Sequence, residues 1–390
     1  MIDTLLLIVM IYGVSIFLLP FPHWPSFFVA LREVIICPQV TIPQRASMLM
    51  YLVKDVLILP VFALFWLADE VFYSNYKSVE IKNPVFIMSQ PRSGTTFLLR
   101  SLSQDKDTFL SLKHLEWRYP FISFWKLIDF LGLRNWLENR SYWPNTKLGK
   151  KCDKIHYHVL GSVEEFGIFL EERFYLHYFL FRRFPFLAVL DKATNYGQFS
   201  DKEKRKIAKT FTKAIKKAFY YRGTSEIFLT KENEAVDFYE ILLEEFPDAR
   251  FLFIVREPSK VLDSYRTMSL TCTEVKHGLH PEQIPGWHEA NIAFRKSECE
   301  KFIEFYSKIQ KRQKNTLITF NQFTTDIYST TLKIYRELEL TISPEFQSLL
   351  QRLQLEQNKR DPGYQNETCE ASEFDFYADF VLSAENTPNN

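Results

Sequence analysis

The chain has 390 residues, 46% of them hydrophobic and 24% charged, which is the balance of a globular protein with one large domain or two modest ones. Its 48 lysines and arginines offset 47 aspartates and glutamates, so a net charge of +1 gives no sign of a nucleic-acid partner. Five widely spaced cysteines include no pair with zinc-binding spacing, and we expect free thiols.

Two apolar runs open the chain. The first, TLLLIVMIYGVSIFLLPF at 4–21, is uncharged and about long enough to cross a bilayer core of ~30 Å. It lacks the basic start and the cleavage site of a signal peptide, so we expect a retained transmembrane anchor in residues 1–24. The second, VLILPVFALFWLA at 56–68, lies in a membrane-proximal segment, 25–79, and can be a second span, an interfacial segment or a buried helix. We therefore expect an integral membrane protein with one or two N-terminal spans and the lipid bilayer as a partner.

The stretch NPVFIMSQPRSGTTFLLRSL, at 83–102, has the order of a phosphate-binding loop: a buried strand, a tight turn and a helix start. Against the pattern GxxxxGK[ST], the four defining positions hold Ser89, Gly94, Thr95 and Thr96. The usual lysine is missing, and Arg92 offers a planar guanidinium inside the loop instead. Asp191 is a weak candidate for the carboxylate that would hold magnesium. The loop therefore predicts binding of a phosphate-like group without the usual metal chemistry.

Two segments follow whose composition has a structural and a functional interpretation. Residues 166–187 are dense in Phe, Tyr and Leu, and predict a buried core helix, the wall of an apolar acceptor pocket or a membrane-facing surface. Residues 201–223 predict a basic amphipathic helix, which either covers the sheet or also touches a membrane surface.

A second strand–loop–helix unit, DARFLFIVREPSKVLDSYRTM, occupies 248–268. Residues 251–255 predict a buried parallel strand, with Arg256 at its carboxyl end and Ser264 on the following helix. Because ligands of open α/β sheets bind at the carboxyl ends of strands, we expect Arg92 and Arg256 on one rim, holding a ligand with two anionic ends. A further buried strand is predicted at 317–320, and the acidic tail from 368 is expected to fray.

These motifs carry a family resemblance. PRSGTTFL resembles the 5′-phosphosulfate loop of sulfotransferases that use 3′-phosphoadenylyl sulfate (PAPS), and IVREPSKVLDSY resembles their 3′-phosphate motif. With LEWRYPF and EEFPDARFLFIVREP, they resemble a membrane-anchored branch of that family over residues 80–365, although many relatives carry Gly where this chain has Ser89. The resemblance implies an α/β fold with a three-layer, P-loop-like parallel sheet flanked by helices, a catalytic domain at 80–367 and a polar tail at 368–390.

The resemblance also implies a reaction and a set of binding residues. The reaction is transfer of the sulfuryl group of PAPS, a co-substrate, to a hydroxyl or amine of an acceptor, with no metal. The 5′-phosphosulfate is assigned to Arg92, Ser93, Gly94, Thr95 and Thr96. The 3′-phosphate is assigned to Arg256 and Ser264, and Lys231 in IFLTKEN is a further candidate to face the cofactor.

Sulfuryl transfer also needs a base to accept the proton of the acceptor. The segment SLKHLEWRYPF, at 111–121, offers Glu116, which we favour, and His114. The segment GSVEEFGIFL, at 161–170, offers Glu165 as the alternative. Ser162 is a plausible cap for a helix there, so Glu165 can equally serve only to complement a helix dipole.

Two other functions remain open at this stage: a P-loop nucleotide kinase or NTPase, and a catalytically silent membrane scaffold of the same fold. The acceptor also stays open, among a lipid, a sterol, a glycan and other alcohols. A nucleic-acid substrate is not expected.

Overall fold

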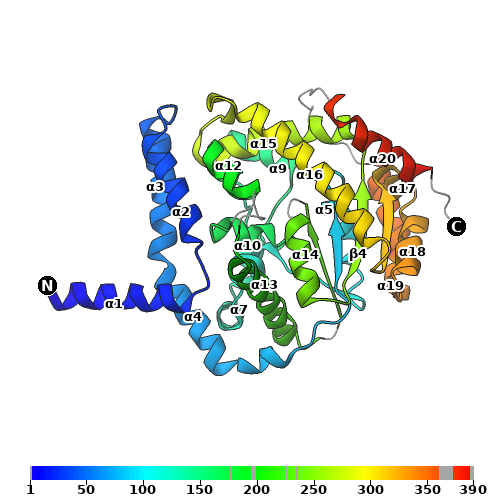
Figure 1. Ribbon diagram of the computed structural model, residues 1–390. Coiled ribbons are helices and arrows are strands. Elements are labelled where there is room, and N and C mark those ends of the chain that lie inside the picture. Colours follow the sequence, from blue (N-terminus) through cyan, green and yellow to red (C-terminus); the bar gives the residue numbers. More distant parts are fainter. Residues whose placement is uncertain are drawn as a thin grey trace.

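A parallel five-stranded sheet forms the centre of the molecule (Figure 1). The computed structural model describes residues 2–175, 178–194, 199–224, 226–233, 236–359 and 372–386. Strand order in the sheet is β2–β3–β1–β4–β5. The strands are β1 (Val85–Met88), β2 (Phe109–Leu110), β3 (Ile227–Glu232), β4 (Arg250–Val255) and β5 (Asn315–Thr319). The predicted parallel α/β fold is confirmed, with β4 and β5 at the two strands expected downstream of the loop.

Alternate side chains of the strands point to opposite faces, and each face has its own core. Phe86 and Phe253 pack on one face beneath α13 (Asp201–Arg222), α14 (Val236–Glu245) and α16 (Trp287–Ile309). Ile87 and Ile254 pack on the other face beneath α5 (Thr95–Leu102), α18 (Ile327–Glu337) and α19 (Pro344–Asn358). Both faces are covered, as a parallel sheet requires, and this leaves the carboxyl edge of the strands as the place for a site.

The connections between strands contain helices and differ in length, from 17 residues between β3 and β4 to 116 residues between β2 and β3. The aromatic stretch predicted as one helix at 166–187 is instead divided between α10 and α11, and Asp191 lies on helix α12 rather than at a strand end. Asp191 is therefore not placed as a magnesium carboxylate of a P-loop enzyme. The remaining helices of the catalytic domain are α6 (His114–Arg118), α7 (Ile122–Phe130), α8 (Arg134–Glu138), α9 (Lys147–Ile155), α10 (Gly167–Glu172), α11 (Tyr178–Arg183), α12 (Leu187–Thr194), α15 (Pro258–His277), η3 (Pro281–Gln283) and α17 (Phe320–Thr325).

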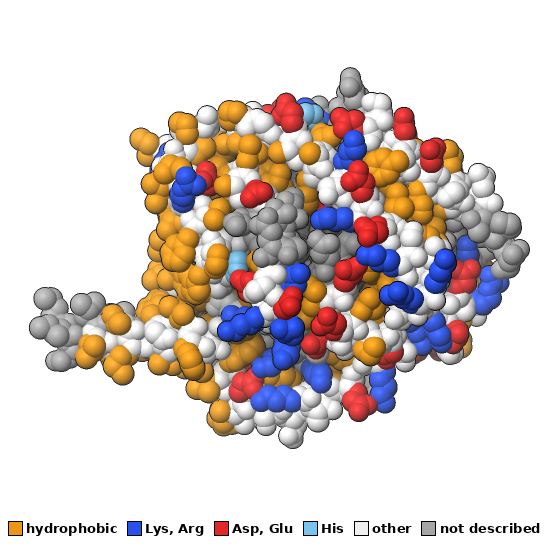
Figure 2. Space-filling model, in the orientation of Figure 1, with side chains coloured by type: hydrophobic (Ala, Val, Ile, Leu, Met, Phe, Trp, Pro, Cys, Tyr) orange, Lys and Arg blue, Asp and Glu red, His pale blue; other side chains and the backbone are white. Residues whose placement is uncertain are grey.

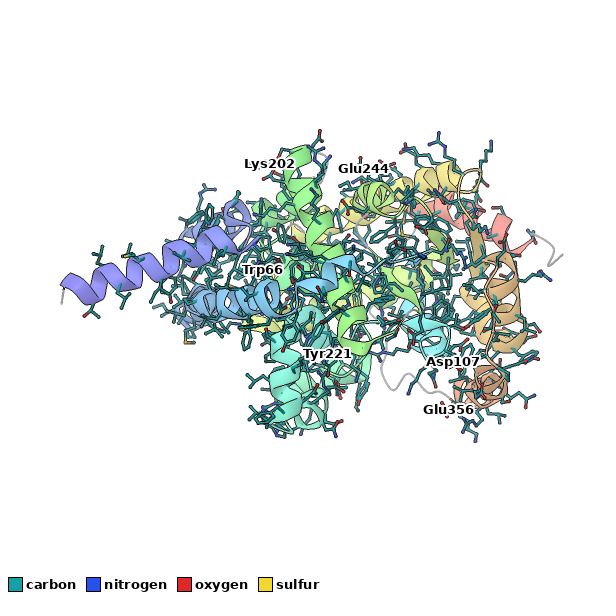
Figure 3. The ribbon with its side chains drawn as sticks, turned by 90° about the horizontal axis from the view of Figure 1, so that it is seen from below. Trp66, Asp107, Lys202, Tyr221, Glu244 and Glu356 are labelled. Carbon is teal, nitrogen blue, oxygen red and sulfur yellow. The ribbon has the colours of Figure 1, made fainter. Side chains whose placement is uncertain are left out.

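Four helices and a 3₁₀ turn precede the sheet: α1 (Ile2–Leu18), α2 (Trp24–Ile36), α3 (Ile42–Leu57), α4 (Leu59–Phe72) and η1 (Ser74–Ser78). Helix α4 continues α3 with a break at Ile58, where Pro60 stands in the first turn of α4. Among the described residues, the stretch Ile42–Phe72 is the helix that is long and apolar enough to cross a membrane. The second apolar run predicted at 56–68 is therefore the middle of a longer element. Figures 1 and 3 both show α1 projecting away from the body of the molecule.

The C-terminal segment corrects one expectation. Residues 372–386 form η4 (Ser372–Phe374) and α20 (Asp375–Glu385), with Tyr377 and Val381 buried. The ring of Tyr377 lies 6.2 Å from that of Phe302 on α16. The expectation that the chain frays from 368 is wrong for these residues, because an apolar stripe in the acidic tail packs on the core.

Candidate active site

A cavity of about 730 Å³ lies at the carboxyl edge of the sheet. Its lining includes the loop after β1, the ends of β3 and β4, one side of α15, the end of α9 and the irregular segments 156–158 and 164–165. The sequence predicted this edge as the ligand site, and most of the predicted cofactor residues line it. These are Arg92, Gly94, Thr95, Thr96, Lys231, Arg256 and Ser264.

The loop after β1 is shaped to leave room at a helix start. Arg92 and Gly94 both have left-handed backbone angles, with φ of 71° and 89°. A Cβ atom added to Gly94 would lie 2.5 Å from the ring of Phe320, so both the conformation and the close approach require glycine there. Helix α5 begins at Thr95, and its first N–H groups have no acceptor within the helix. The hydroxyl of Ser93 is buried and has no hydrogen-bond partner within the described part of the chain. The loop therefore presents donors suited to an oxyanion.

The two motifs that the sequence placed on one rim touch each other. Arg92 donates from Nε to the hydroxyl oxygen of Ser264 at 2.9 Å, and Arg256 donates from Nη1 to the carbonyl oxygen of Arg92 at 3.0 Å. The guanidinium of Arg256 also stacks on the ring of Phe320, at 4.2 Å from its centre. The two predicted anion sites are therefore contiguous parts of one surface.

Helix α15 gives the cavity its length. Ser264, Met268, Cys272 and Lys276 follow one another at four-residue spacing, and all four line the cavity. Residues at this spacing share one face of a helix. The cavity thus extends along α15 for about three helical turns beyond the Arg92–Ser264 contact.

Glu165 lines the same cavity as the phosphate-binding loop and forms a buried hydrogen-bonded pair with Lys231. Lys231 Nζ lies 2.7 Å from Glu165 Oε1, and Asn233 Nδ2 lies 3.1 Å from Oε2. Burial raises the pKa of Glu165; Lys231 opposes this rise, and the carboxylates of Glu232 and Glu164 add to it. A carboxylate with a raised pKa binds a proton more readily near neutral pH, which is the property that a general base needs.

Glu164, the next residue, is held by positive charge. Its Oε1 accepts from Arg100 at 2.7 Å, and the same oxygen lies 3.8 Å from Nε2 of both His156 and His158. Burial raises the pKa of Glu164, but Lys231, His156 and Arg100 together bring that pKa below its ordinary value. Burial lowers the pKa values of both histidines well below their usual range. Glu164 is thus kept ionised by the groups around it.

His156, His158 and Glu164 are also close enough to hold a metal ion, since their ligand atoms lie within 4.8 Å of one another. Three contacts disfavour a metal there. Arg100 already binds the central carboxylate oxygen, Lys231 lies 3.9 Å from the other, and His158 Nε2 lies 2.8 Å from His114 Nδ1. We therefore assign no metal ion to these three residues in the proposed reaction.

The base that the sequence favoured is not in the cavity lining. Glu116 binds Arg222 through both carboxylate oxygens, at 2.8 and 2.6 Å, and accepts the backbone N–H of Lys113. His114 is completely buried behind His158, and burial lowers its pKa well below the usual value. Of the three predicted bases, Glu165 is the one that the structure brings to the cavity. It does not lie in a first helical turn, because α10 begins at Gly167.

Sequence reasoning missed several cavity residues: Arg100, His156, His158, Glu164 and Lys276. Two of them carried a readable signal. Arg100 follows Thr96 by four residues on the same helix face, and Lys276 extends the stripe that begins at Ser264. The segment HYH at 156–158 lies in irregular structure, where no periodicity shows its direction.

Comparison with known proteins agrees with this geometry. Residues 177–344 match the model of a protein family described as the sulfotransferase family. This match covers 168 of the 390 residues, so that region of the chain is similar to the sulfotransferase family. The matched region contains Lys231, Arg256 and Ser264, whereas the loop at 89–96 precedes it. No curated protein matches the chain.

Two solved sulfotransferase structures share the fold. Sulfotransferase STF9 from Mycobacterium avium superposes with a TM-score of 0.62 at 13% identity, covering 93% of this chain and 96% of that chain. Sulfotransferase STF1 from Mycobacterium tuberculosis H37Rv gives a TM-score of 0.61 at 14% identity, covering 96% and 97%. At such low identity the likeness concerns the fold, so the roles of individual residues rest on the contacts described above.

Proposed function

We propose that this sulfotransferase moves the sulfuryl group of PAPS to a hydroxyl, or an amine, of an acceptor by in-line transfer. The observation that carries the proposal is the cavity itself. It is lined both by an oxyanion-binding loop with Arg92 and Arg256 and by a buried carboxylate, Glu165, whose pKa is raised. The similarity of residues 177–344 to the sulfotransferase family supports the same reaction class.

The charge of the cavity suits PAPS. Seven basic side chains line it against four glutamates, so an anion is favoured over a cation. Arg256 and Ser264 are proposed to hold the 3′-phosphate, while Arg92, Ser93, Gly94, Thr95 and Thr96 hold the 5′-phosphosulfate. Because these residues are contiguous, they can bind the two anionic groups of a single nucleotide.

In the proposed reaction, the acceptor oxygen attacks sulfur while the bond from sulfur to the bridging oxygen of the 5′-phosphate breaks. The proton of the acceptor passes to Glu165, and 3′-phosphoadenosine 5′-phosphate leaves. Arg92 and the N–H groups at the start of α5 stabilise the charge that grows on the bridging oxygen. Lys231 orients Glu165 and keeps part of its charge balanced. No metal is needed in this scheme, because arginine and hydroxyl groups already bind the leaving phosphate.

The N-terminal 72 residues are proposed to attach the enzyme to a membrane. The apolar stretch Ile42–Phe72 and the exposed apolar helix α1 motivate this proposal. Lipids and sterols then join glycans and other alcohols as candidate acceptors. A kinase is less well supported, since Thr95 replaces the P-loop lysine and Asp191 lies on a helix, α12, instead of directly after a strand.

Transfer of labelled sulfate tests the proposal. Purified full-length protein in detergent would be incubated with ³⁵S-labelled PAPS and separate lipid, glycan and peptide extracts. We expect one fraction to gain label with the wild-type protein and none to gain it with Glu165→Gln. Absence of label from every fraction, with PAPS binding intact, would favour the silent scaffold.

A further inference from the structure

One flank of the molecule exposes apolar side chains along its whole length. This surface, which we call the apolar flank, consists of the outer side of the continuous stretch α3–α4 and the neighbouring side of α2. Hydrophobic side chains gather along this edge, at the left of Figure 2. Six of its residues are each exposed by 60% or more: Ile42, Met50, Leu57, Leu64, Val71 and Phe72. Exposed apolar area of this extent marks an interaction surface.

The opposite side of the same stretch is fixed to the catalytic domain at both ends. Near its start, Gln44 donates to the carbonyl oxygen of Gly278 at 2.6 Å, and Ser47 hydrogen-bonds His277 at 3.0 Å. Near its end, Asp69 is completely buried, lies 2.9 Å from Lys217 Nζ and accepts the N–H of Ile122. Only the outer side of the stretch is therefore available to lipid.

This attachment decides between crossing a membrane and lying along it. At 1.5 Å per residue, the 31 residues Ile42–Phe72 extend about 46 Å, well beyond a hydrocarbon core of ~30 Å. A crossing helix would be surrounded by lipid or by other spanning helices, whereas this one is covered on one side by a domain with a polar surface. The stretch therefore resembles an interfacial helix, whose apolar side faces the lipid and whose other side is bound to the protein.

Basic side chains border the apolar flank, as an anionic headgroup layer requires. Arg32, Lys54 and Lys77 expose 68%, 48% and 51% of their side chains. Helix α13 lies beside α4, with Lys213 Nζ 3.3 Å from Glu70 (Figure 3). The first half of α13, starting near Lys202, is rich in exposed lysine and arginine. Such residues add attraction to acidic lipids.

Helix α1 leaves the molecule on the side that the flank faces (Figure 1). It carries no charge after Asp3, and its exposed residues include Leu7, Met10 and Phe17. Tyr12 ties it to the flank through a hydrogen bond to the carbonyl oxygen of Leu57 at 3.3 Å. An uncharged helix that points away from the body needs an apolar medium.

We infer that the apolar flank is half-embedded in one leaflet of a bilayer with acidic headgroups, so that Ile42–Phe72 lies in the plane of the interface and does not cross. Helix α1 enters the hydrocarbon, and the catalytic domain stays on the same side as both ends of the stretch. The inference rests on the membrane attachment proposed above and holds whichever acceptor the enzyme uses.

Cysteine labelling in sealed membrane vesicles tests the topology. The full chain would carry Cys369→Ser together with either Pro38→Cys, before α3, or Ser74→Cys, after α4; both positions are exposed. A membrane-impermeant maleimide would be added before and after detergent. We expect both cysteines to have the same accessibility from outside. If one were labelled in intact vesicles and the other only after detergent, the stretch would cross the membrane and the inference would be wrong.

A second measurement identifies what covers the flank. The full chain with Leu64→Cys or Leu355→Cys would be labelled with a fluorophore and reconstituted in phosphatidylserine-containing vesicles whose acyl chains carry nitroxides. Leu64 is 68% and Leu355 60% exposed, but Leu355 lies on α19, away from the flank. We expect at least twofold stronger quenching at position 64 than at 355. Equal quenching at both would overturn the inference, and so would a flank covered by a second copy of the chain, since that would shield position 64.

Discussion

The two sides of the catalytic cavity are built in different ways. The phosphate wall, residues 91–97 with Arg256 and Ser264, comes from two compact strand–loop–helix motifs that contact each other directly. The acid wall, residues 154–158 with Glu164, Glu165 and Lys231, comes from the end of α9 and from irregular segments, which buried charge pairs join to the end of β3. The first wall can bind an anion through local geometry. The second depends on contacts between residues far apart in the chain, and there we place the proton transfer.

The largest effect is expected on the acid wall. Glu165→Gln keeps the size of the side chain but removes the proton acceptor, so turnover should fall by roughly 10²–10⁴-fold. Binding of 3′-phosphoadenosine 5′-phosphate should change little, and steady-state kinetics with a binding titration would show both. Glu116→Gln is the matched control: it should cost stability through the loss of its pair with Arg222 and leave turnover per folded molecule nearly unchanged. The opposite ranking of the two variants would return the base to Glu116.

In the phosphate wall, we expect substitution of Arg92 to lower turnover. Arg92→Ala removes the positive charge that would contact the transferred group. We therefore expect kcat to fall by about 10²–10³-fold, as it does when an oxyanion-hole donor is lost. Arg92→Lys should recover part of this, because a point charge still stabilises the bridging oxygen. A kcat that stays at the wild-type level in Arg92→Ala would remove this residue from the transferring end.

Arg256 should affect binding more than turnover. The charge on the 3′-phosphate does not change during transfer, so an interaction with it is equal in the ground and transition states. Arg256→Ala should weaken PAPS binding by ~1.5–3 kcal/mol, or one to two decades in Kd. Lys260→Ala, at an exposed position of helix α15, which follows Arg256, is the control and should leave Kd unchanged. Loss of turnover at saturating PAPS would show that the two ends of the nucleotide are reversed.

The smallest effect sharpens the role of the Lys231–Glu165 pair. Because burial raises the pKa of Glu165, activity should fall with decreasing pH at a value above the ordinary glutamate range. Lys231 opposes that rise, so Lys231→Met should raise the pKa of Glu165 further and move the acid limb of kcat/KM to higher pH. A limb that stays in place or moves to lower pH would mean that another group is titrating.

The contrast between the walls also shows how far the sequence could be interpreted. Arg92, Arg256 and Ser264 lie where they were expected, because a residue just after a parallel strand must stand at the sheet's carboxyl edge. Glu116 was favoured because its segment was expected to return to that edge and because the resembling family often has a Glu in this region. The segment does return, but the carboxylate turns to Arg222, a partner 106 residues away that no local pattern reveals.

The N-terminal region shows the same limit in another form. Hydropathy located apolar runs at 4–21 and 56–68, yet the second run is part of the longer stretch Ile42–Phe72. The first half of that stretch escaped notice because its inner face carries polar residues, such as Gln44 and Ser47, that bind the catalytic domain. Composition shows how apolar a segment is, and only its tertiary contacts show which side is exposed.

The central claim is that the cavity holds a nucleotide with a 3′-phosphate, and the most direct test is a comparison of ligands without any acceptor. Thermal unfolding of the full-length protein would be followed with 3′-phosphoadenosine 5′-phosphate in EDTA, and with ATP and magnesium at equal concentration. We expect the first ligand to bind at least tenfold more tightly, which adds about 1.4 kcal/mol or more of stabilisation once both ligands exceed their Kd. Stronger stabilisation by ATP with magnesium would contradict the account and favour a P-loop kinase.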